Sequence, residues 1–253
     1  MITEIHIGIL FHAMVTAIIA VIAAAFVIFL IRRWTLLDRA RRAYVGFWVV
    51  TALVWSAITV RYFMIGAGLW GAEINVIDLF IQIMVFCTGP PLYYYAGLRI
   101  FSDKRVAVAL VVVSLIFIFV GVLFLFGEHG LVRVAVTNFS TETNLNPVSY
   151  GIFIMNALAL IALIAYDFIL RMRQWVVHRD SALLYDALYS AAILIYVGLG
   201  SIDNSKIFLE WGLVILRIFY SAAFLFAYSV VVEHEFSREL FLTEDEPHKQ
   251  HAS

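Results

Sequence analysis

Seven long apolar runs constrain the fold of this chain more than any other feature. A helix that crosses a bilayer needs roughly 20 consecutive, mostly apolar residues. Seven segments reach that length, at about 6–31, 44–66, 74–99, 106–127, 148–170, 182–202 and 207–232. The runs lack apolar/polar alternation, and an open strand cannot satisfy its backbone in lipid. The sequence therefore predicts an all-α integral membrane protein, a seven-transmembrane helix bundle whose membrane domain covers residues 1–235.

Composition supports a lipid environment. Hydrophobic residues make up 64% of the chain and charged residues only 14%, whereas soluble domains average about 45–50% apolar and 25% charged residues. The formal net charge of −1 argues against a nucleic-acid partner. The single cysteine, Cys87, excludes an internal disulfide and a metal site built on paired cysteines. We therefore expect no metal.

The basic residues predict the orientation of the bundle, because cytoplasmic links of membrane proteins are enriched in Lys and Arg. The opposite side carries only Arg133 and Lys206. The distribution predicts an N-terminus outside and a C-terminus in the cytoplasm. The thirteen basic residues on the predicted cytoplasmic side are Arg32, Arg33, Arg39, Arg41, Arg42, Arg99, Lys104, Arg105, Arg171, Arg173, Arg179, Arg238 and Lys249.

Polar side chains inside the spans are the candidates for a ligand-binding site, because such groups are costly in lipid and tend to mark function. Asp78 and Gln82 share one helix face, as do Glu210 and Arg217. We expect Arg217 near the midplane, paired with Asp78 as first choice and Glu210 as second. The full candidate set, all in the outer half, is His12, Arg61, Asp78, Gln82, Asn156, Asp203, Glu210 and Arg217.

Two interpretations of these polar groups remain open, with ion or proton pathways as a third. In the first, the ion pairs are structural and fix the helices against one another. In the second, the groups surround a wet cavity, reachable from outside, that holds a small polar or anionic ligand around Arg61 and Arg217. His12, Gln82 and Asn156 are then expected to share that cavity. The fourth span contains no polar residue in its apolar run except Ser114 and is expected at the periphery, facing lipid.

The inner half of the third span contains a predicted hinge at Gly89, Pro90 and Pro91. Two prolines remove two backbone donors and clash with the preceding turn, so the helix should bend or break there. Tyr93–Tyr95 follow and are expected at the cytoplasmic interface, either as an anchor or as part of a hinge that passes motion.

Two carboxylates lie near the predicted cytoplasmic face of the fifth and sixth spans. Asp167 and Asp186 are each expected to meet Arg99 or Arg171.

The segment FCTGPPLYYYAGLRIFSDKR, from Phe86 to Arg105, resembles the third-helix motif of seven-transmembrane sensor regions in bacterial membrane-anchored AraC-type regulators and histidine kinases. In that family the helices sense a signal and a C-terminal cytoplasmic domain reports it. The resemblance implies a multi-pass sensor in a bacterial inner (plasma) membrane. Here only a short cytoplasmic tail, 236–253, follows the last span, so we expect the output to pass through a separate cytoplasmic or membrane protein.

No arrangement of residues supports catalysis, and we expect no cofactor. A retinal Schiff base needs a deep lysine in the last span, but Lys206 lies at its outer edge. A haem needs histidines from two helices, and only His6 and His12 lie in or near a span, both on the first. The expected function is a non-enzymatic, receptor-like sensor that signals in trans. The alternatives are an accessory or structural subunit of a larger membrane complex and, third, a small-solute transporter.

Overall fold

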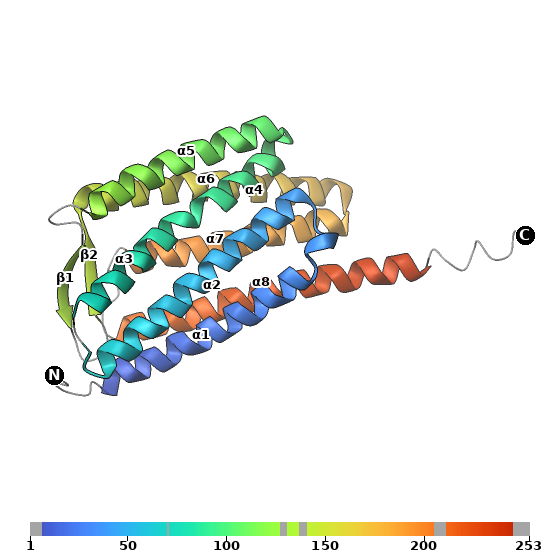
Figure 1. The fold of residues 1–253 in the computed structure, drawn as a ribbon. Coiled ribbons are helices and arrows are strands. Elements are labelled where there is room, and N and C mark those ends of the chain that lie inside the picture. Colours follow the sequence, from blue (N-terminus) through green and yellow to red (C-terminus); the bar gives the residue numbers. More distant parts are fainter. Residues whose placement is uncertain (1–6, 70, 127–130, 137–140, 205–210, 245–253) are drawn as a thin grey trace, which may run out of the picture.

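The computed structural model describes residues 7–69, 71–126, 131–136, 141–204 and 211–244. Within these residues, seven helical segments are long and apolar enough to cross a membrane. They lie side by side in one bundle (Figure 1). The protein is therefore a multi-pass membrane protein whose described spans are all α-helical, and the predicted seven-helix bundle is confirmed.

The third span consists of two helices, so eight α-helices build the seven spans that the structure describes. Local signals explain several of their ends. Asp38 accepts a hydrogen bond from the Arg41 backbone N–H at 2.8 Å, as an N-cap residue does. Pro147 occupies the first turn of its helix, where its missing N–H costs nothing. The helices are α1 (Ile7–Arg32), α2 (Arg39–Gly66), α3 (Ala72–Cys87), α4 (Gly89–Phe101), α5 (Lys104–Leu125), α6 (Pro147–His178), α7 (Ser181–Asn204) and α8 (Trp211–Glu244), with a short 3-10 turn at Trp34–Leu36.

The two ends of the bundle differ. At one end, β1 (Leu131–Val136) pairs antiparallel with β2 (Thr141–Leu145) in the link between α5 and α6; we call this the hairpin end. The opposite end holds the links after α1, α4 and α6, and we call it the arginine-rich end. There α8 projects beyond the other helices (Figure 1). Because α8 continues to Glu244, the expected tail at 236–253 begins as helix.

The order of the helices brings distant segments together. α1 packs between α2 and α8, and α7 packs between α6 and α8. α4 contacts α2, α5 and α6. α5 has the smallest buried share of any span, and its large side chains such as Ile116 and Phe119 are exposed while Ser114 is fully buried. The expected peripheral position of the fourth span is confirmed.

An aromatic core fills the middle of the bundle. Trp48 packs edge-on against Phe26 and Tyr196 and in a tilted arrangement against Phe224. Such off-parallel geometries suit the ring quadrupoles and add to the energy of burial. This core connects α1, α2, α7 and α8.

The predicted break in the third span is confirmed. α3 ends at Cys87 and α4 begins at Gly89, with Thr88 between them. The rings of Pro90 and Pro91 are tolerated because they lie in the first turn of α4. The expectation for the tyrosines that follow is wrong for two of the three. Tyr93 and Tyr95 are buried in the core of the bundle, because α4 packs against α2, α5 and α6.

Candidate functional site

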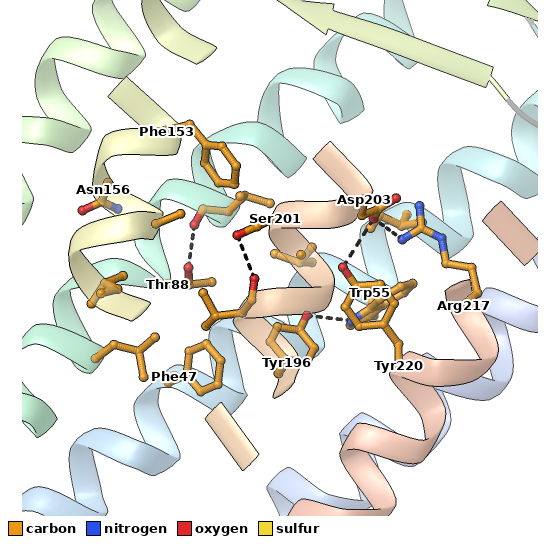
Figure 2. Close-up of a pocket in the computed structure, with 18 residues that line it drawn as sticks. Phe47, Trp55, Thr88, Phe153, Asn156, Tyr196, Ser201, Asp203, Arg217 and Tyr220 are labelled. Carbon is orange, nitrogen blue, oxygen red and sulfur yellow. Dashed lines mark hydrogen bonds and ion pairs between the residues drawn. The ribbon is translucent and has the colours of Figure 1, made fainter. Parts of the chain in front are cut away.

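A cavity of about 100 Å³ lies next to the helix break (Figure 2). Its wall comes from five of the seven spans: α2, the α3/α4 pair, α6, α7 and α8. Most of the wall is aliphatic or aromatic, with polar groups at separate places. The wall includes Trp55, Thr88, Leu92, Asn156, Ala157, Tyr196, Gly200, Asp203, Arg217 and Tyr220.

One side of the cavity carries an ion pair. Arg217 Nη1 donates to Asp203 Oδ2 at 2.5 Å, and both side chains are largely buried. The guanidinium carbon of Arg217 lies 5.0 Å from the centre of the Trp55 ring and 5.7 Å from that of Tyr220. Tyr220 Oη also donates to Asp203 Oδ2 at 3.5 Å. Arg217 is therefore neutralised by a carboxylate and covered by two aromatic rings.

The expected first-choice partner of Arg217, Asp78, was wrong. Asp78 pairs instead with Arg61, in an ion pair buried between α2 and α3. Glu210 lies outside the described residues. Arg217 lies about 9 Å along α8 from Trp211, in the half of the span toward the hairpin end.

The candidate ligand-binding residues separate into those that line the cavity and those that do not. Asn156, Asp203 and Arg217 line the cavity, whereas His12, Arg61, Asp78 and Gln82 are not among its lining residues. His12 is fully buried and stacks on Tyr62, with 4.3 Å between ring centres. The seven candidates that the structure describes therefore do not all line this cavity, and the expected sharing by His12, Gln82 and Asn156 is not found in it.

The other side of the cavity combines the helix break with a buried amide (Figure 2). Thr88 Oγ1 donates to the Val85 carbonyl at 2.7 Å. Asn156 is 5% exposed, and its Oδ1 has no hydrogen-bond partner among the residues that the structure describes. The carboxamide of Asn156 lies so close to Gly89 that an added Cβ there would be 3.3 Å from Nδ2 and 2.8 Å from Ser114 Oγ. Gly89 thus permits α4, α5 and α6 to meet at the break.

A second cluster of polar residues lies toward the arginine-rich end. Arg99 Nη1 is 2.6 Å from Asp186 Oδ2, and Arg99 Nε is 3.5 Å from Asp167 Oδ2. Arg171 Nε lies 3.5 Å from Asp167 Oδ1 and Arg41 Nη2 lies 3.6 Å from Asp186 Oδ1. We call these five residues the arginine–aspartate cluster. Its members come from α2, α4, α6 and α7, and the expectation that Asp167 and Asp186 each meet Arg99 or Arg171 is confirmed.

Asp167 is the most buried member of the arginine–aspartate cluster, with no exposed surface. Ser190 Oγ donates to Asp167 Oδ2 at 2.6 Å, and the hydroxyls of Ser190 and Tyr95 share a hydrogen bond of 3.2 Å. Arg171 Nη2 donates to the Arg99 carbonyl at 2.7 Å. These bonds satisfy the carboxylate and tie the end of α4 to α6 and α7.

Sequence reasoning missed the aromatic part of the cavity. Trp55 Nε1 donates to Tyr196 Oη at 2.9 Å, and Tyr220 completes the wall. Nothing in the sequence separates these rings from the many other aromatic residues of the spans. Only Tyr220 could have been predicted, because it follows Arg217 by three residues and so shares its helix face.

No protein-family model, no curated protein and no solved structure matches this chain. Among the residues that the structure describes, no three His, Cys, Asp or Glu side chains are grouped as metal ligands. The class of protein that the fold defines is a seven-helix, multi-pass membrane protein.

Proposed function

We propose that this protein is a membrane sensor in which a small molecule binds the cavity beside the helix break and repositions α4. The observation that carries the proposal is that α4 connects two sites. Thr88, next to its first residue, and Leu92 line the cavity. Arg99, two turns further along, contacts both carboxylates of the arginine–aspartate cluster. In this role the protein catalyses no reaction.

The proposed mechanism treats α4 as a short rigid helix. One end of it is the joint at Thr88, and the other carries Arg99 and its contacts with the two carboxylates. α4 has 13 residues, about 20 Å of helix, and its prolines leave the joint at Thr88 without two backbone hydrogen bonds. In the proposed mechanism α4 exchanges between two positions. A ligand shifts that equilibrium only if it binds one position of α4 better than the other. A tilt of α4 at the cavity moves Arg99 relative to Asp167 and Asp186, and a partner protein at the arginine-rich end reads that change.

The proposal includes an orientation in which the arginine-rich end faces the cytoplasm and the cavity lies nearer the outside. The excess of basic residues at that end supports it, and the resemblance around Gly89–Pro91 supports a bacterial inner membrane. Reporter fusions at Thr141 and at Ser253 should label opposite faces of the membrane, with Ser253 on the cytoplasmic face. Labelling of both positions from one face would contradict the proposed topology.

The sensor proposal is tested by filling the cavity and measuring the distant end of α4. Ala157 lines the cavity and is 6% exposed, so Ala157→Leu places three extra carbons inside. Spin labels at Phe101→Cys on α4 and Ala182→Cys on α7, both exposed positions, report their separation. A Cys87→Ala background removes the single native cysteine. We expect the distance distribution between the two labels to shift in the full-length protein in nanodiscs.

The matched control is Ala162→Leu, the same substitution at an exposed position of α6, which should leave the distribution unchanged. Gly200→Ala fills less of the cavity and does so from α7, since its single added carbon would lie 3.6 Å from Tyr220 Oη. Identical distributions in the unfilled protein and in both filled variants would contradict the sensor proposal. They would instead favour the alternative of an accessory subunit, for which no coupling along α4 is required.

A further inference from the structure

The size, charge and hydrogen bonding of the cavity together indicate which ligand it accepts. The inference rests on the proposed function, because it concerns the same cavity. The sequence left open a small polar or an anionic ligand.

Volume sets the first limit. An engineered apolar cavity of about 150 Å³ binds benzene, which has six non-hydrogen atoms. The cavity here, at about 100 Å³, scales to about four or five non-hydrogen atoms. Aromatic and aliphatic side chains form most of its wall, including Trp55, Leu92 and Tyr196. The ligand must therefore present mostly apolar surface.

Charge sets the second limit. The positive charge of Arg217 is already matched by Asp203 at 2.5 Å, with 8% and 17% of the two side chains exposed. An anion that took Arg217 would leave Asp203 buried and unpaired, and a cation that took Asp203 would do the same to Arg217. Breaking a buried pair in this way is strongly unfavourable. The ion pair thus makes the wall polar but favours an uncharged ligand.

Hydrogen bonding sets the third limit. Asn156 lines the cavity, and its buried Oδ1 has no hydrogen-bond partner among the described residues. Buried polar atoms in proteins nearly always have a hydrogen-bond partner, and a ligand hydroxyl donates the bond that this oxygen lacks. Asn156 also approaches Gly89, so a ligand held there lies against the joint between α3 and α4.

We propose that the cavity binds a small uncharged molecule of about four or five non-hydrogen atoms that is mostly apolar and donates one hydrogen bond to Asn156.

Three probes of five non-hydrogen atoms test this class: 1-butanol, 1-chlorobutane, which lacks the hydroxyl, and propionate, which is charged. Melting temperatures are measured on the full-length protein in nanodiscs over a range of probe concentrations. The change in melting temperature that each probe causes in Ala157→Leu is subtracted from the change in the unaltered protein, which removes effects of the probes on the bilayer. At about ten times its Kd, 1-butanol should raise the melting temperature by about 3–6 °C.

Asn156→Leu keeps the size of the side chain and removes the amide. We expect it to weaken 1-butanol binding about 2–10-fold and to leave 1-chlorobutane binding unchanged. If Asn156→Leu does not assemble, tighter binding of 1-butanol than of 1-chlorobutane to the unaltered protein supports the hydrogen bond, and equal binding overturns it.

Tighter binding of propionate than of 1-butanol, lost in Arg217→Gln, would overturn the inference in favour of an anion. Saturable binding of none of the three probes would overturn the ligand class altogether. Neither result decides the sensor proposal, which depends on the spin-label distances in Ala157→Leu without any probe.

Discussion

Replacing Asp203 with alanine should lower the apparent melting temperature of the detergent-solubilised protein by roughly 6–20 °C. The variant leaves the guanidinium of Arg217 buried beside Trp55 without its carboxylate. Breaking one partner of a buried pair typically costs about 3–5 kcal/mol. The melting temperature is measured by circular dichroism or by a fluorescence assay that does not use a thiol-reactive dye. Arg217→Lys should lose less, because lysine keeps the charge but not the planar fork.

A double variant separates the cost of an unpaired charge from a general loss of packing. Asp203→Leu combined with Arg217→Met removes both charges and should restore most of the lost stability, since apolar replacements of buried pairs are often neutral or better. Glu73→Ala, at an exposed acidic residue near the same end of the bundle, serves as the control and should melt like the native protein. An Asp203→Ala variant of unchanged stability would show that the pair contributes nothing.

The second large effect is expected at Asp167. Asp167→Leu removes the fully buried carboxylate that contacts Arg99, Arg171 and Ser190. Arg99 keeps Asp186 at 2.6 Å, but Arg171 loses its only described carboxylate. We expect a loss of about 3–5 kcal/mol, measured as the free energy of unfolding or the corresponding fall in melting temperature.

Asp167→Asn distinguishes charge from hydrogen bonding at the same position. Its amide oxygen still accepts from Ser190, so it should retain more stability than Asp167→Leu. Arg173→Ala, at an exposed position of the same helix, should be close to neutral. If Asp167→Leu proved as stable as Arg173→Ala, the arginine–aspartate cluster would not be a joint between α4, α6 and α7.

Local features of the sequence determined the spans and several contacts. The length of each apolar run predicts a spanning helix because every backbone group must be satisfied within lipid. Pro90 and Pro91 predict the break because the missing donors act within one turn. The pairing of Arg99 with Asp167 and Asp186 was also predictable. All three lie near the same end of the bundle, where the choice of partners is small.

Only the tertiary structure decided which carboxylate meets Arg217 and which residues share a cavity. The sequence places Asp78, Asp203 and Arg217 in the same half of the bundle, but this does not define the rotation of a helix about its axis or the order of its neighbours. α8 packs against α7 and α1, so Arg217 meets Asp203, while Asp78 on α3 faces Arg61 on α2. The cavity is likewise invisible in the sequence, because its wall is assembled from five spans whose contacts depend on side-chain packing across the whole bundle.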